Sequence, residues 1–228
     1  MIKLTFAALS LGLTLILPGL PDTIVASGAG SLPGTAEDLS SDASLTEIDG
    51  TLAFPDGVDM FKIDILNPLN FSAFTVSVGA FGVPDPELFL FDANGLGVYE
   101  NDDASAGDTQ SCLPSAGSTN PCASSRGGAG PVTPGIYYLA ITRSENSPLS
   151  DMGEIFSPLQ STDVVGPDLT AGGGDPIIGW DGGVFTGPDF DLTQFDIQIA
   201  DTPEPITWPL LATALVALIL FRRKPQTR

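Results

Sequence analysis

Hydrophobic and polar residues alternate with a period of two along several short stretches of this chain. Phe61, Ile63 and Ile65 alternate with polar neighbours, which predicts a half-buried strand with these three side chains facing inward. The same alternation predicts inward-facing residues in two more strands: Phe74, Val76 and Val78 in the first, and Phe195, Ile197 and Ile199 in the second. One buried face per strand is typical of antiparallel sheets.

Other strands follow from apolar runs and turn residues. Residues 87–91 are apolar on both faces, which predicts a strand inside a sheet. Asn94-Gly95 then predicts a tight turn, with a return strand at 97–99. Residues 136–142 predict another strand, and the body shows no helical period. We therefore expect an all-β fold over residues 45–201, an antiparallel, jelly-roll-like β-sandwich.

The N-terminal residues 1–26 have the pattern of a secretory signal peptide. Lys3 is followed by an apolar run from Leu4 to Leu17, and small residues begin at Ala26. We expect export through the Sec machinery and cleavage after Ala26, with an uncleaved signal anchor as the alternative. Residues 27–44 are rich in Gly, Ser and acids, which predicts a flexible lead-in.

Residues 206–221 form an uninterrupted apolar run followed by a basic tail at 222–228. As a helix the run would be ~24 Å long, slightly short of the ~30 Å core of a bilayer. Arg222, Arg223 and Lys224 can reach the interface and offset the difference. The pattern predicts a transmembrane helix whose basic tail stays in the cytoplasm.

Residues 202–228 carry three parts in order: Pro203-Glu204-Pro205, the apolar run with Trp208, and Arg222-Arg223-Lys224. This order resembles the PEP-CTERM sorting signal of Gram-negative bacteria. The resemblance implies that an exosortase, a membrane-embedded protease, recognises Pro203, Glu204 and Pro205 and cuts near them. The protein would then leave the inner membrane for the cell surface or the exopolysaccharide matrix. A permanent C-terminal anchor is the alternative.

Four short motifs in the body carry a second resemblance: residues 59–63, 87–95, 101–103 and 134–139. In this order they resemble the bacterial pre-peptidase C-terminal domain, in the variant found in PEP-CTERM proteins. The resemblance implies an accessory β-sandwich without catalysis. The long insertion at 143–191, which contains Trp180, resembles the same variant.

Acidic residues dominate the composition, with 28 Asp and Glu against 8 Lys and Arg. Between residues 27 and 201 there are three basic residues and 26 acids, a formal charge of −23. Such a body repels nucleic acid and anionic headgroups and suits divalent cations. A solvated acidic surface is the alternative.

The chain has no histidine, which excludes Ser-His-Asp and Cys-His catalysis and the common histidine metal sites. No nucleophile elbow, phosphate loop or dinucleotide fingerprint is present. We therefore expect a non-catalytic surface or matrix protein. A membrane-anchored module that binds carbohydrate or protein is the alternative, with Trp180 as its ligand contact.

Cys112 and Cys122 lie ten positions apart in a loop of an exported chain, which predicts a disulfide.

Oxygen ligands that suit Ca²⁺ gather around one predicted hairpin: Asp92, Asn94, Asn101, Asp102 and Asp103. We expect hairpin pairing to bring Asp92 near the last three. Ordinary turn hydrogen bonding is the alternative, and we expect no obligatory cofactor. For Trp180, the alternative to a ligand contact is a structural role as a lid over the end of the core.

Overall fold

The computed structural model describes residues 22–26, 28–53, 57–116, 122, 125–126, 128–156, 162–182 and 192–201. Within these ranges the chain forms strands and two short 3-10 helices, η1 (Gly79–Phe81) and η2 (Gly172–Gly174). None of the helices described is long and apolar enough to cross a membrane. The predicted span at 206–221 and the sorting residues around it lie outside the described residues.

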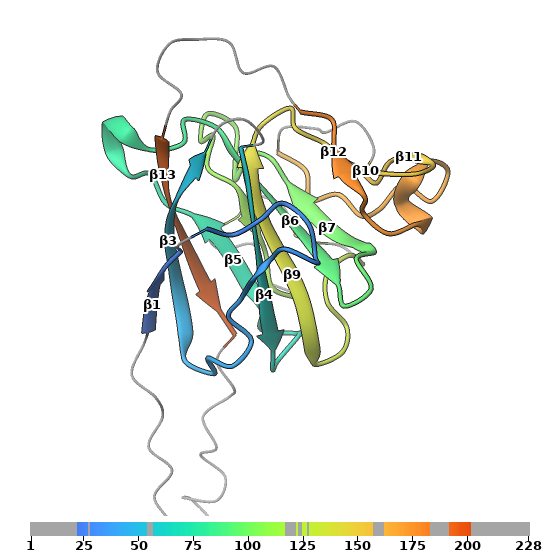
Figure 1. Cartoon of the computed structure of the whole chain (residues 1–228), viewed down its shortest axis with the longest axis horizontal. Helices are drawn as coiled ribbons and strands as arrows, with labels where there is room; N and C mark the ends of the chain where they lie inside the picture. Colours follow the sequence, from blue (N-terminus) through green and yellow to red (C-terminus); the bar gives the residue numbers. More distant parts are fainter. Residues whose placement is uncertain are drawn as a thin grey trace, which may run out of the picture.

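Three sheets are present in the described part of the chain (Figure 1). In spatial order, the first contains β1 (Asp22–Val25), β3 (Leu45–Ala53), β13 (Leu192–Ala200), β5 (Ser72–Thr75) and β8 (Cys112–Leu113). The second contains β2 (Glu37–Asp38), β4 (Val58–Ile65), β9 (Gly135–Arg143), β6 (Pro86–Asp92) and β7 (Gly97–Asn101). The third contains β11 (Gly153–Glu154), β10 (Pro148–Ser150) and β12 (Gly179–Trp180).

The two five-stranded sheets pack face to face around the main core, so the predicted all-β sandwich is confirmed. Phe61 of β4 and Phe195 of β13 meet across the core with ring centroids 6.1 Å apart. The predicted inward residues of both strands are buried, because alternation turns every second side chain to the same face.

The β6–β7 hairpin also forms as predicted. Leu88 and Leu90 of β6 face the main core, whereas Phe89 and Phe91 belong to a second apolar cluster on the opposite face. Both faces of β6 are therefore covered. The turn after β6 contains Gly95 at φ +80°, a left-handed conformation that glycine adopts without steric cost.

Two details of the strand predictions are wrong. In β5, Ala73 faces the main core, while Phe74 packs against the cysteine pair and Val76 is 39% exposed. The strand is thus shifted by one position from the predicted phase, and this moves every side chain to the other face. The sandwich is also not purely antiparallel, because the edge strands β1 and β2 run parallel to β3 and β4.

The segment predicted as a lead-in contributes to the sandwich. β2 pairs with β4, and Leu39 is buried in the main core. The carbonyl of Gly30 accepts a hydrogen bond from the amide of Met60 at 3.0 Å. The cleavage predicted after Ala26 would remove β1, which pairs with β3 along its length.

Two insertions interrupt the strands, one at 103–134 that contains the two cysteines and one at 143–191. The second insertion carries the three-stranded sheet, which lies beside β6 and β7 in Figure 1. Its residues Ile155, Phe156 and Ile177 pack on Phe89 and Phe91 in the second apolar cluster. The outer face of the second sheet is therefore covered by the insertion, and this cover makes the candidate site below an interior one.

Candidate functional site

The hairpin does not bring together the residues predicted to bind calcium. Asp92 and Asn94 lie at the turn, where the Asp92 carboxylate accepts hydrogen bonds from the amides of Asn94 (2.8 Å) and Leu96 (3.0 Å). Asn101 pairs with Leu88 at the open end of the hairpin. Four residues of β6 separate the two ends, or about 14 Å. The expected proximity of Asp92 to Asn101 is therefore wrong, because the register separates them.

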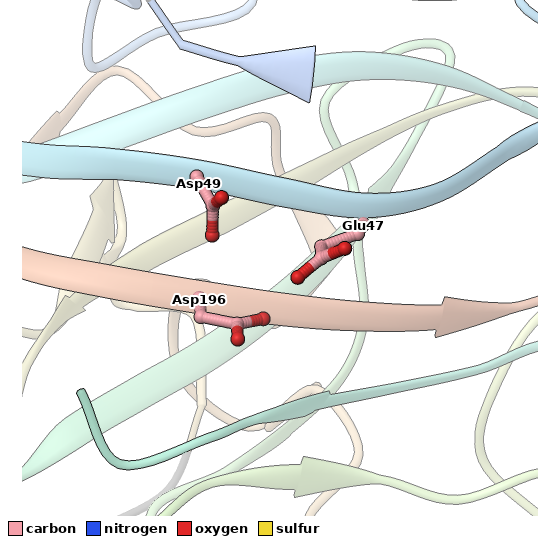
Figure 2. A group of neighbouring side chains, drawn as sticks. All are labelled: Glu47, Asp49 and Asp196. Carbon is pink, nitrogen blue, oxygen red and sulfur yellow. The ribbon is translucent and has the colours of Figure 1, made fainter. Parts of the chain in front are cut away.

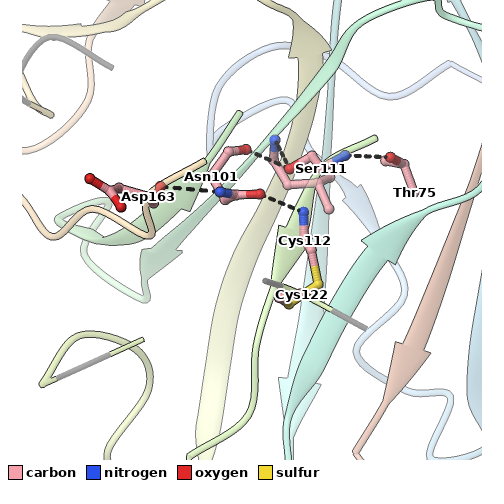
Figure 3. Close-up of a disulfide and its surroundings, with 7 residues drawn as sticks. Thr75, Asn101, Ser111, Cys112, Cys122 and Asp163 are labelled. Atoms are coloured by element: carbon pink, nitrogen blue, oxygen red, sulfur yellow. Dashed lines mark hydrogen bonds between the residues drawn. A yellow bond between two sulfur atoms is a disulfide. The ribbon is translucent and has the colours of Figure 1, made fainter. Parts of the chain in front are cut away.

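Asn101 has a structural role instead, shown in Figure 3. Its side-chain amide donates to the carbonyl of Asp163 at 3.1 Å, and its side-chain oxygen accepts from the amide of Cys112 at 2.8 Å. Its backbone carbonyl accepts from the hydroxyl of Ser111. Asn101 thus ties β7 to both insertions.

Cys112 and Cys122 form a disulfide, as the sequence predicts, with Cα atoms 5.4 Å apart (Figure 3). Both residues are buried with Ala104 and the ring of Phe74. Closing so short a loop stabilises the fold by about 2–3 kcal/mol, mainly by restricting the unfolded chain.

Trp180 lies half-buried in β12 and packs edge-on against Phe89 at 5.3 Å and Phe91 at 6.3 Å between ring centroids. Its indole nitrogen donates a hydrogen bond to the carbonyl of Ser31 at 2.7 Å. The only hydrogen-bond donor of its side chain is therefore used inside the molecule. This placement is that of a lid over the second apolar cluster.

Five carboxyl groups gather where β6 begins and β7 ends. We call them the buried acid cluster: Asp85, Glu87, Glu100, Asp102 and Asp103. Phe89 pairs with Glu100 and Leu88 with Asn101, so the next position along each strand places Glu87 across from Asp102. Alternation puts Glu87 on the same face as Phe89, under the insertion.

The two glutamates form the floor of this cluster. Glu87 and Glu100 are both 0% exposed, and their four side-chain oxygens accept no hydrogen bond from a donor group among the described residues. A proton shared between the two carboxyl groups would join them by a hydrogen bond, which opposes the rise in the pKa of Glu100. One carboxylate oxygen of Asp85 and one of Asp102 are also buried without a hydrogen-bond partner among the described residues. Buried polar atoms without partners are rare, because each costs the free energy of its lost hydration.

The insertion covers Glu100 directly. The amide of Glu100 donates a hydrogen bond to the carbonyl of Val165 at 2.9 Å, and the amide of Val165 donates one to the carbonyl of Glu100 at 3.0 Å. At the other edge, the amide of Ser144 donates to the carbonyl of Asp85 at 2.9 Å. The cluster therefore lies at the junction between the second sheet and the insertion.

Burial and like charges raise the pKa values of all these groups. Burial raises the pKa of Glu100 to about 9, with a further contribution from Asp102. Burial raises the pKa of Glu87 well above its usual value, and the charged neighbours that add to this shift are all acids. The pKa of Asp102 rises to about 6, again mainly through burial. Each carboxyl thus favours either a proton or a cation beside it.

The mouth of the cluster has the spacing of a metal site. One carboxylate oxygen from each of Asp85, Asp102 and Asp103 lies within 4.8 Å of the other two. These three side chains are half-buried, so solvent reaches the mouth but not the floor.

A second acidic group lies on the outer face of the first sheet. Glu47 and Asp49 of β3 and Asp196 of β13 lie side by side, and we call them the acid ladder (Figure 2). Asp49 pairs directly with Asp196. Burial, then the charges of Asp196 and Glu47, raise the pKa of Asp49. The hydroxyl of Thr23 donates to Glu47 at 2.6 Å.

Sequence reasoning found Asp102 and Asp103 but missed Glu87 as a site residue. The missed signal was an acid in phase with two aromatic residues, Phe89 and Phe91, on a strand that is apolar on both faces. An acid at such a position is buried with the aromatic side chains.

No protein-family model matches the chain, and a search among curated proteins found no match. Function must therefore be argued from the residues themselves.

Proposed function

We propose that the chain is an exported, non-catalytic protein of the cell surface or exopolysaccharide matrix of a Gram-negative bacterium. In this proposal an exosortase processes the sorting signal after the chain has entered the inner membrane as a single-pass intermediate. The observation that carries it is the order of Pro203-Glu204-Pro205, the apolar run and Arg222-Arg223-Lys224. The lack of histidine supports a non-catalytic role.

The end of the sandwich is compatible with such processing. The last strand ends at Ala200, and the carboxylate of Asp201 accepts hydrogen bonds from the amides of Leu66 (2.5 Å) and Asn67 (2.8 Å). A cut near Pro205 would therefore leave every described strand in place and would keep the hydrogen bonds of Asp201. The sorting signal begins directly after this fastened residue.

We further propose a jelly-roll-like connection of the strands. Leaving the short edge strands aside, the spatial orders are β3-β13-β5-β8 in one sheet and β4-β9-β6-β7 in the other. Successive strands mostly alternate between the sheets, which supports two interlocked Greek keys. The placement of Trp180 favours this structural module over the anchored binding module, because its indole packs and bonds within the fold.

The test is the mass of the mature protein in cells that contain an exosortase. We expect the wild-type chain to lose the residues after about Pro205, and Glu204→Ala to keep them in the membrane fraction. Gln226→Ala in the tail is the matched control and should be processed normally. A wild-type protein that keeps its full tail in these cells contradicts the proposal and supports permanent anchoring.

A further inference from the structure

We propose that the buried acid cluster is a calcium site that fastens the insertion to the second sheet. The ligands would be carboxylate oxygens of Asp85, Asp102 and Asp103 at the mouth, with the buried carboxyl groups of Glu87 and Glu100 beside the ion at the floor. This inference does not rest on the proposed sorting, because it concerns only the folded body.

The mouth has the geometry of a shared ion. Calcium binds oxygen at about 2.4 Å, so two oxygens on the same ion lie at most ~4.8 Å apart. The oxygens of Asp85, Asp102 and Asp103 meet this limit. Asp85 comes directly before β6, and Asp102 and Asp103 come directly after β7, so an ion bound here would bridge the two chain segments at the open end of the hairpin.

The floor supplies a second, independent observation. Glu87 and Glu100 are fully buried, and neither carboxylate accepts a hydrogen bond from a donor group among the described residues. Their two carboxyl groups lie within hydrogen-bond reach of each other, which requires a shared proton or a nearby cation. The strand register places Glu87 across from Asp102, one position beyond the pair of Leu88 and Asn101. A carboxylate in such surroundings is costly unless a cation or hydrogen bonds compensate it. One divalent cation would compensate several of these groups together.

The ligand chemistry selects calcium among the common metal ions. Three carboxylates that can bind through one or both oxygens, together with water at the half-buried mouth, can supply the six to eight hard oxygens that calcium takes. Magnesium demands a near-ideal octahedron and keeps several waters, and zinc prefers nitrogen and sulfur ligands. The acid ladder differs, because it has no fully buried carboxyl group beside it in the described part of the chain and Glu47 already has a hydrogen-bond donor in Thr23.

An ion at this position would also act on the insertion. Asp85 is bonded through its carbonyl to Ser144, where the insertion begins, and Glu100 is paired with Val165 further along it. Binding the carboxylates of Asp85 and Asp102 to one ion, beside Glu100, would hold both attachments in place. We therefore expect calcium to stabilise the whole body against unfolding.

Thermal unfolding of the full chain in a non-ionic detergent tests this inference. Calcium in large excess over its Kd should raise the Tm of the wild-type protein by about 5–10 °C relative to a chelator. Asp102→Asn should weaken calcium binding at least about tenfold in calorimetric titration, because it removes a charged ligand. Glu87→Gln should weaken it as well, because it removes a buried carboxylate next to the ion. Asp49→Asn, in the acid ladder, is the matched control and should keep the full shift.

Near-ultraviolet circular dichroism confirms that each variant is folded before it is compared. If Glu87→Gln does not fold, Asp102→Asn at the half-buried mouth makes the same comparison. Equal Tm values in calcium and chelator would overturn the inference. Equal shifts with calcium and magnesium would also overturn it, since they indicate general screening of the acidic surface. Loss of the shift in Asp49→Asn would place the ion at the ladder instead.

Discussion

The outer faces of the two large sheets carry the same kind of residue in opposite environments. On the first sheet, the side chains of the acid ladder, Glu47, Asp49 and Asp196, are half-buried and lie side by side (Figure 2). On the second sheet, Glu87 and Glu100 lie beside an aromatic cluster under the insertion. The strands that carry these acids are similar, so the difference comes from the cover and not from the sheet.

This difference sets the free energy attached to each carboxylate. At the ladder, water and salt screen the like charges, so each neighbouring pair destabilises the fold only slightly. Under the insertion, water is excluded, and an ionised carboxylate needs a counter-charge or a proton. The covered face therefore points to a ligand, whereas the open face is sufficiently explained by solvation.

The largest change in stability is expected when an aromatic ring is removed from the covered face. Phe89→Ala should lower the free energy of unfolding by about 3–5 kcal/mol, because Phe89 is fully buried against Phe156 and Trp180. Thr51→Ala, at an exposed position of β3, is the matched change on the open face and should stay within about 0.5 kcal/mol. Chemical denaturation measures both. Similar losses for the two variants would mean that the insertion does not bury this face in solution.

Much of the main core could be predicted from the sequence, because residues such as Phe61 and Phe195 lie on strands with one buried face. Phe74 was wrongly predicted to face the main core, because the residues that are buried there, Ala73 and Thr75, give a weaker apolar signal than Phe74 and Val76. The insertion's strands have only two or three residues, too few for a period to be seen.

The burial of the acids could not be predicted from the sequence for a different reason. An acid in a sequence normally indicates exposure, since Asp and Glu are rarely buried without a partner. Asp102 and Asp103 were found because they directly follow the return strand of the predicted hairpin, among other oxygen ligands. Glu87 lies 13 positions before Glu100, and only the pairing of β6 with β7 and the cover of the insertion bring the two together.

A smaller effect is expected at the lid of the covered face. Trp180→Phe keeps most of the aromatic contact with Phe89 but removes the hydrogen bond to the Ser31 carbonyl. We expect a loss of about 1 kcal/mol in the free energy of unfolding, the usual contribution of one such bond. A glycan array run on the same variant separates the two interpretations of Trp180. Unchanged stability together with lost glycan binding would favour a ligand contact over a lid.

The smallest effect is expected on the open face. The raised pKa of Asp49 means that the folded protein binds this proton more tightly than the unfolded chain does. The resulting stabilisation is complete below the unfolded pKa of about 4 and is lost as the pH rises through the folded pKa. Asp49→Asn should therefore raise the stability at pH 7 by about 0.5 kcal/mol, less in high salt, with the gain vanishing near pH 3. Asp151→Asn, in an exposed turn, should change nothing. If Asp49→Asn destabilises the protein at pH 7, the ladder holds a cation and the contrast between the two faces fails.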